Sequence, residues 1–156
     1  MKITNSFSPA EAMICLSHRL ELIADKYIFK PMGLSSISVK ILMLLKNGSQ
    51  MTVSELIKKT GATKSNMSQR LTFLEKEQYI TRNYASDSND KRKVLIKLTF
   101  SGKKRIIDLK KRLEKAQISF EKKFTAKEVS QHKDFIKKMN LILDNEEDKL
   151  EKIFKF

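Results

Sequence analysis

The chain has 156 residues, enough for one domain with appended helices and for a hydrophobic core that needs neither disulfides nor metals. Its 32 Lys and Arg outnumber its 18 Asp and Glu, and the formal charge of +14 favours a polyanionic partner. With only four Gly, two Pro and 40% hydrophobic residues, the composition excludes a disordered chain and favours packed helices over a β-sandwich.

The single cysteine, Cys15, excludes an intramolecular disulfide and a zinc site built from several cysteines, and it suits a reducing compartment. Met1-Lys2 leads into no apolar segment of the signal-peptide type. The densest apolar run, residues 41–45, is far too short to span a membrane. We therefore expect a cytoplasmic protein with no membrane partner.

Two helices are predicted in the first fifty residues. Ser8-Pro9-Ala10-Glu11 has the pattern of a capping box with proline in the first turn, and Lys30-Pro31 is expected to stop the helix that follows. That helix has one apolar stripe, formed by Met13, Leu16, Leu20, Ile23 and Tyr27. A second helix begins after Ser35 or Ser36 and ends at Asn47-Gly48, and its apolar composition predicts burial.

The next segment predicts two helices joined by a tight turn. Thr52 to Glu55 forms another capping box, and the short helix that it starts must end by Gly61. Thr63 is the predicted cap of a helix over residues 64–77. In that helix Met67, Leu71 and Leu74 share one side. Two helices connected in this way are typical of a helix-turn-helix.

The pattern then changes to β structure and back to helix. Residues 79–84 and 93–98 are rich in β-branched and aromatic residues and flank a polar stretch, which predicts a hairpin with a charged tip. A long helix is expected after Thr99, and a last helix after Thr125, which forms a third capping box with Glu128. The predicted fold class is mostly α with a small β-hairpin.

Three short motifs occur in order after the predicted helix-turn-helix. Leu74-Glu75 is followed by Arg82, Asp90 by Arg92, and Leu98-Thr99 by Gly102. Over residues 35–115 this order and spacing resemble the MarR family of regulators. The resemblance implies a winged helix-turn-helix over residues 35–99, with dimerisation helices in residues 1–34 and 100–156. It also implies a homodimer, usually a repressor, bound to a pseudo-palindromic DNA duplex.

The first turns of the second helix of the motif carry the candidate DNA contacts. A helix-turn-helix places these residues against base edges, where short polar groups, amides and cations are suitable readers. The candidates here are Lys64, Ser65, Asn66, Ser68 and Gln69. Arg70 and Lys76 are better suited to phosphate, and the alternative for the whole set is a solvated helix face.

The charged hairpin tip is the second candidate contact. The resemblance implies that Arg92 enters or borders the minor groove beside Lys91 and that Asp90 orients its basic neighbours; arginine suits a narrow, negative groove. The alternative is that these charges only keep the hairpin soluble. The basic cluster Lys103 to Arg105 is equally compatible with phosphate contact and with a solvated face.

Two residues depart from the family pattern. Gln78 stands where the family usually has glycine, so it either adopts a left-handed conformation at a cost of about 1 kcal/mol or the helix ends differently. Phe73 occupies a position that is often polar in the family, and it is a poor candidate for DNA contact.

Other functions have weaker support in the sequence. A buried, inert Cys15 is favoured over a redox sensor, and His18 with a distant His132 is too few ligands for a metal site. No catalytic triad, cofactor site or phosphate-binding loop is present, so neither an enzyme nor a cofactor is expected. The resemblance allows a small aromatic or anionic effector. The main alternative function is a winged-helix module that binds protein or RNA.

Overall fold

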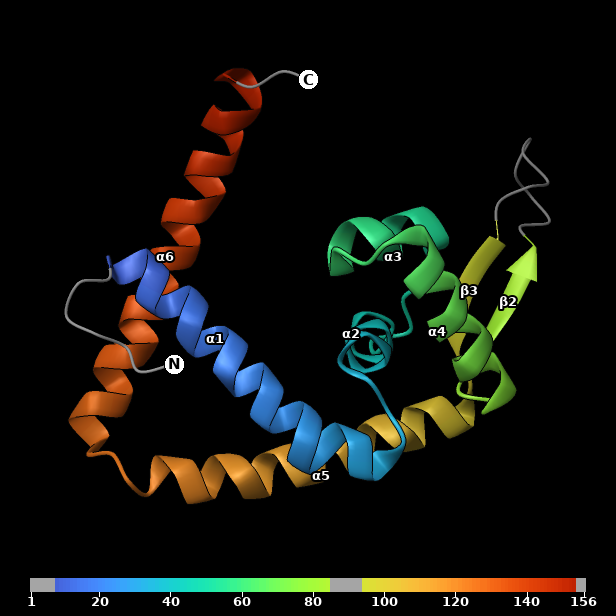
Figure 1. The fold of residues 1–156 in the computed structure, drawn as a ribbon, viewed down its shortest axis with the longest axis horizontal. Coiled ribbons are helices and arrows are strands. Elements are labelled where there is room, and N and C mark those ends of the chain that lie inside the picture. Colours follow the sequence, from blue (N-terminus) through green and yellow to red (C-terminus); the bar gives the residue numbers. More distant parts are fainter. Residues whose placement is uncertain (1–7, 85–93, 154–156) are drawn as a thin grey trace. The chain divides into compact units, whose positions relative to one another are not determined.

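The computed structural model describes residues 8–84 and 94–153. The chain forms two compact units, Met1–Leu113 and Glu114–Phe156. The α-helices of the described residues are α1 (Pro9–Ala24), α2 (Ser36–Leu44), α3 (Val53–Thr60), α4 (Lys64–Lys76), α5 (Phe100–Glu121) and α6 (Ala126–Ile153). The strands are β1 (Met51–Thr52), β2 (Ile80–Tyr84) and β3 (Val94–Leu98), as Figure 1 shows. The prediction of a mostly helical fold with a small hairpin is confirmed.

Three helices begin where the capping boxes predict. In each box the hydroxyl of the cap residue accepts from a backbone N–H three residues on, and the glutamate at that position accepts from the N–H of the cap residue. These pairs are Ser8 with Glu11, Thr52 with Glu55, and Thr125 with Glu128. Local sequence is therefore enough to define these helix starts.

The first helical segment continues beyond the predicted stop. A π-helical stretch, η1 (Asp25–Phe29), and a 3-10 turn, η2 (Lys30–Met32), follow α1 directly. Pro31 lies in the first turn of η2, where a missing N–H removes no necessary hydrogen bond. The segment ends at Gly33, whose φ of 66° is accessible to glycine at little cost. The prediction that Lys30-Pro31 stops this segment is wrong for that reason.

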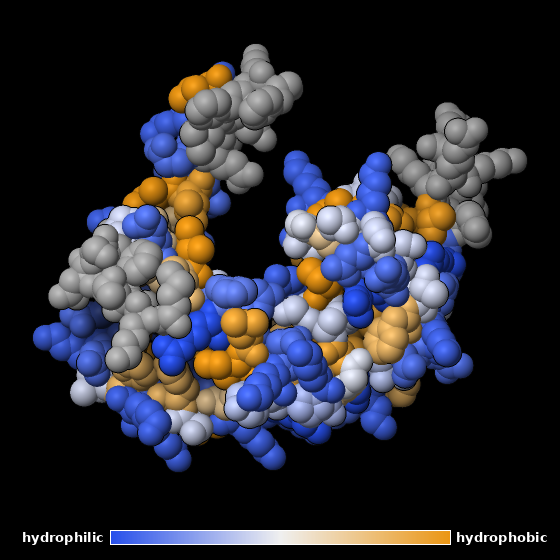
Figure 2. Space-filling model, viewed as in Figure 1, coloured by the Kyte–Doolittle hydropathy of each residue, from blue (hydrophilic) through white to orange (hydrophobic). Residues whose placement is uncertain are grey.

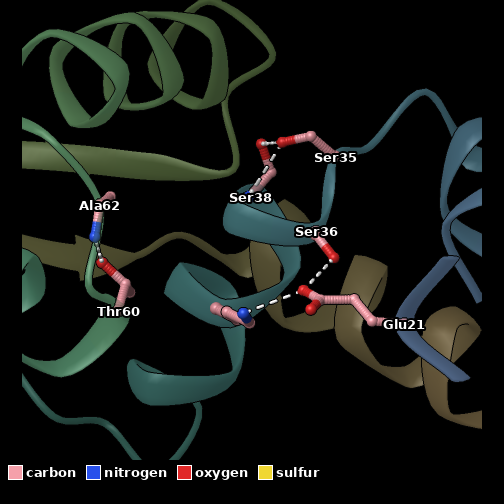
Figure 3. A network of polar contacts seen from close by, with 7 residues as sticks. Glu21, Ser35, Ser36, Ser38, Thr60 and Ala62 are labelled. Atoms are coloured by element: carbon pink, nitrogen blue, oxygen red, sulfur yellow. Dashed lines mark hydrogen bonds and ion pairs between the residues drawn. The ribbon is translucent and has the colours of Figure 1, made fainter. Parts of the chain in front are cut away.

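The core of the first unit surrounds α2. The most deeply buried large side chains of this core are each less than 2% exposed. The set comprises Ile41, Leu42, Leu45, Leu56, Met67, Leu71, Leu74, Ile80, Ile96 and Leu109. The buried Ser38 is hydrogen-bonded to the cap residue Ser35, with 3.0 Å between their hydroxyl oxygens (Figure 3). The predicted burial of α2 is confirmed, although this helix ends at Leu44, before Asn47.

The sheet has three antiparallel strands in the order β1-β3-β2. In the hairpin Ile80 pairs with Leu98 and Tyr84 with Val94, so the ladder leads directly to the segment that joins the two strands. The short strand β1 pairs Met51 with Ile96 and was not predicted from the sequence. It leads directly into α3, and β2 follows α4, so the helix-turn-helix is joined to the sheet at both ends.

The second unit contains the end of α5 and all of α6. The rings of Phe120 and Phe124 lie 5.0 Å apart at the turn between these helices, just before the cap residue Thr125. Within the described ranges, no single helix is both long and apolar enough to cross a membrane. Only a bent pair, Ala10–Met32 with Ser36–Leu44 at 80°, has the combined length and composition, and its second member is the core helix α2.

Candidate nucleic-acid interface

The turn between α3 and α4 is built by local hydrogen bonds. Gly61 ends α3 with a φ of 68°. Thr60 donates its hydroxyl to the carbonyl of Leu56 at 2.7 Å. It also accepts from the backbone N–H of Ala62 at 3.3 Å (Figure 3). Thr63 then caps α4 by accepting from the N–H of Asn66. The predicted helix-turn-helix is confirmed as a structure.

One side of α4 carries a row of exposed polar side chains. Met67, Leu71 and Leu74 on the inner side are at most 1% exposed and hold the helix against the core. The exposed polar residues on the opposite side are Lys64, Ser65, Ser68, Gln69 and Thr72. The last four share one face, because they are spaced three and four residues apart. We call these five residues the outer row of α4. This face can present hydroxyl, amide and ammonium groups to a ligand.

Asn66 and Arg70 occupy a different side of α4 from the outer row. Both are partly buried, and Arg70 Nε donates to Asn66 Oδ1 at 3.2 Å. Both also line a hollow of 260 Å³ whose other walls include His18 and Glu21 on α1 and Ser36 on α2. Two-point recognition of adenine by an asparagine uses both amide atoms. Arg70 therefore already engages one of the two atoms that Asn66 would need.

Arg82, a cation beside the outer row, was not among the site residues predicted from the sequence. Arg82 on β2 donates from Nη2 to the hydroxyl of Thr72 at 3.3 Å, and its Nε lies 2.9 Å from Oε2 of Glu75. The guanidinium thus lies against the exposed side of α4. The only sequence signal was that Arg82 ends the first family motif, which says nothing about the direction of the side chain.

The hairpin strands are described, but their connection is not. Asp90, Lys91 and Arg92, the predicted wing contacts, lie outside the described residues. The described ladder runs from the pair Ile80–Leu98 to the pair Tyr84–Val94. The wing contacts stay a prediction.

The residue after the C-cap of α4, Gln78, adopts the left-handed conformation. This was one of the two alternatives that the sequence left open; the other was a different end of the helix. Gln78 has a φ of 58°, and among the described non-glycine residues it alone has a positive φ. The N–H of Gln78 donates to the carbonyl of Glu75, and that of Tyr79 to the carbonyl of Leu74, both at 2.9 Å. These bonds satisfy the last carbonyls of the helix. Phe73 is partly buried and packs against the core.

A polar cluster joins α1 to α2 beside the hollow. Oε1 of Glu21 accepts from the hydroxyl of Ser36 at 2.7 Å and lies 2.9 Å from Nζ of Lys40 (Figure 3, where the lysine is unlabelled). The hydrogen bond from Lys40, followed by that from Ser36, lowers the pKa of Glu21 below its ordinary value of 4.5. The carboxylate is therefore held ionised at neutral pH.

Cys15 and the histidines form no metal-binding site in the described part of the chain. Cys15 is a free, partly buried thiol on α1. In the described ranges no group of three His, Cys, Asp or Glu side chains is placed to hold a metal ion.

Comparisons with known proteins match this architecture. A family model described as a winged helix DNA-binding domain matches residues 37–117, which include nearly all of α2, then α3, α4, the hairpin strands and most of α5. The helix-turn-helix and hairpin therefore define a winged-helix DNA-binding protein.

Relatives and solved structures narrow the class. The uncharacterized HTH-type transcriptional regulator YcgE of Bacillus subtilis (strain 168) is 30% identical over 119 residues, 76% of each chain. A mutant of MarR from E. coli superposes with a TM-score of 0.78 at 20% identity, covering 87% of this chain and 98% of that one. The same mutant complexed with operator DNA gives 0.68 at 22%, covering 89% and 99%. The chain belongs to the winged-helix DNA-binding family of HTH-type transcriptional regulators, and it has the fold of the MarR structures.

Proposed function

We propose that the protein is a homodimeric repressor that binds a pseudo-palindromic DNA duplex through α4. The observation that carries this proposal is the outer row of α4, because polar side chains at the start of this helix are exposed while its apolar side is buried in the core. In a helix-turn-helix these positions meet the major groove. The similar MarR structure with operator DNA supports the same use of the fold.

Within α4 the roles divide by chemistry. Ser65, Ser68 and Gln69 read base edges in this proposal, and Lys64 is close enough to the helix start to reach a base or a phosphate. Asn66 and Arg70 act together, since they are hydrogen-bonded to each other, and contact DNA only from the flank of the helix. In the wing, Arg92 and Lys91 reach the minor groove and Asp90 orients them, as the family resemblance implies.

The dimer is supported by apolar side chains that a single chain leaves exposed. On α1 and η1 the predicted stripe is largely uncovered, with Ile23 47% and Tyr27 64% exposed. On α6 Leu141 is 65% and Ile153 69% exposed. Figure 2 shows apolar side chains along α6, the helix labelled in Figure 1. Several exposed apolar side chains along one helix mark an interface, and we assign those of each helix to contact with a second copy of the chain.

Release by a small molecule is the regulatory part of the proposal. The hollow between α1, α2 and α4 contacts α4 through Asn66 and Arg70, so a ligand there can shift the helix that reads DNA. Another similar structure, at a TM-score of 0.67, is NadR in complex with 4-hydroxyphenylacetate. We propose a small aromatic or anionic effector on these grounds.

Selection of duplexes from a randomised library, followed by gel shifts, tests DNA binding. We expect a preferred sequence with two related half-sites. If a dimer neutralises about eight phosphates, the logarithm of affinity falls with the logarithm of salt at a slope of about −7. Failure to enrich any duplex, or stronger binding to single-stranded RNA, contradicts the proposal and favours the RNA-binding alternative. A strictly monomeric protein in sedimentation equilibrium contradicts the dimer.

Base reading is tested at Gln69. The variant Gln69→Ala removes an exposed amide, and we expect it to weaken binding to the selected duplex by about 1–3 kcal/mol and to relax preference at one base position. The matched control is Gln131→Ala on α6, which removes the same exposed group far along the chain. Equal losses on selected and random duplexes for Gln69→Ala contradict base reading.

A further inference from the structure

Arg105, in the second turn of α5, turns its guanidinium toward other segments of the first unit. It is partly buried, and its Nη2 donates to the carbonyl oxygen of Met32. Its guanidinium carbon lies 5.5 Å from the centre of the Tyr79 ring. Its Nε is buried without a hydrogen-bond partner in the part of the chain that the structure describes. The side chain therefore connects two segments that are far apart in the sequence.

Both contacts of Arg105 are at the ends of helical segments. Met32 is the last residue of η2, which continues the path of α1, and carbonyls at such an end lack a partner in their own helix. A cation there is also favoured by the helix dipole. Tyr79 directly follows Gln78, at the end of the recognition helix α4. Arg105 thus joins the end of the α1 segment to the end of α4.

The start of α5 is itself held tightly against the end of α4. Thr99 donates its N–H to the carbonyl of Tyr79 at 3.1 Å and its hydroxyl to that of Gln78 at 2.6 Å. Gly102 approaches so closely that an added Cβ would lie 2.0 Å from the Tyr79 carbonyl oxygen. The first turn of α5 is therefore packed rigidly against the end of α4. From this position Arg105 contacts η2.

Simple stabilisation is a poor account of this arrangement. A partly buried guanidinium with a buried, unpaired Nε carries a desolvation cost, and apolar side chains in such places are often equally or more stabilising. Arginine adds direction, because its planar group can meet a carbonyl at its edge and a ring at its face in one relative placement only. Arg105 accordingly specifies how the end of η2 is placed relative to the end of α4.

We propose that Arg105 is a positioning residue for DNA recognition, which fixes the α1–η2 segment relative to α4. This inference rests on the proposed function, in which α1 contributes to the dimer and α4 reads DNA. In such a dimer the placement of α1 relative to α4 sets the separation of the two recognition helices. Loss of Arg105 therefore weakens the selection of half-site spacing while each α4 still reads its own half-site.

The experiment compares full-chain variants on duplexes selected by the wild-type protein. Arg105→Met keeps the length of the side chain without the guanidinium, and Arg105→Lys keeps the charge without the planar fork. Arg112→Met is the matched control, because Arg112 lies two turns further along α5 on the same side and is exposed. Dissociation constants are measured on the full site, on a single half-site, and on full sites with one or two base pairs inserted between the half-sites.

For both Arg105 variants we expect the advantage of the full site over the half-site to fall by about tenfold, the middle of the range for residues that couple two sites. Half-site affinity stays within about twofold of wild type, and the penalty for inserted base pairs shrinks. Arg112→Met behaves as wild type. An unchanged ratio of full-site to half-site affinity overturns the proposal, even where the melting temperature falls. If the wild-type protein selects no duplex at all, the proposed function fails instead.

Discussion

The left-handed residue after the recognition helix offers a direct test of stored backbone strain. Gln78 has a φ of 58°, a conformation that costs a non-glycine residue about 1–2 kcal/mol. Glycine removes this cost but loses about 0.5–1 kcal/mol through the greater entropy of the unfolded chain. The variant Gln78→Gly should therefore raise the free energy of unfolding by about 0.5–1 kcal/mol, since the Gln78 carbonyl still accepts from Thr99.

The assay is chemical and thermal denaturation at one fixed protein concentration, because the stability of a dimer depends on concentration. For a chain of this size the expected rise in melting temperature is about 1–4 °C. The matched control is Glu77→Gly, one residue earlier, where φ is −75° and no strain is present to relieve. That control should be destabilised by about 0.5–1 kcal/mol.

Opposite signs for the two glycine variants are the signature of strain at Gln78. If Gln78→Gly is destabilising, or if both variants change stability by the same amount in the same direction, the residue is not strained and the reasoning is refuted. The unchanged carbonyl contact to Thr99 means that a loss of stability cannot be assigned to a broken hydrogen bond.

Two further predictions concern contacts around α4 and α1. Gly102→Ala places a Cβ 2.0 Å from the Tyr79 carbonyl oxygen, so we expect lower thermal stability and weaker binding to the selected duplex, and wild-type values in both assays contradict the close approach. The hydrogen bond from Lys40 lowers the pKa of Glu21, so Glu21 stabilises the fold above its ordinary pKa of 4.5 and this contribution is lost as pH falls through the lower folded value. Glu21→Gln should therefore be less stable than wild type at pH 7, with a gap that closes under acid in denaturation curves, and a gap independent of pH excludes this role.

The elements that the sequence predicted correctly depend on contacts within a few residues. The capping boxes at Ser8, Thr52 and Thr125 act across three positions, and Gly61 acts on its own backbone. The outer row of α4 was predictable in part, because Met67, Leu71 and Leu74 define the buried side and the helical period then places Ser65, Ser68 and Gln69 away from it. Which of these groups touch DNA stays a prediction.

The features that sequence reasoning missed depend on partners far along the chain. Asn66 and Arg70 have the same local pattern as their exposed neighbours, and only the packing of α1 and α2 beside them makes that flank of α4 partly buried. Arg82 turns toward Thr72 because β2 passes along α4. Strand β1 forms because β3 offers it an edge.

The sequence by itself determined the order of the helices, the three starts marked by capping boxes, and the hairpin, since each follows from backbone preferences or short-range hydrogen bonds. At Gln78 it left two alternatives, and the structure decided for the left-handed one. Only the tertiary structure decided that Arg105 faces inward, toward Met32 and Tyr79, although Lys103 and Lys104 beside it are exposed. The physical reason is that the helical period places Arg105 near the side of Gly102 and Leu109 but does not say which groups its guanidinium will meet. Its direction follows from the carbonyl and the ring that other segments bring within its reach.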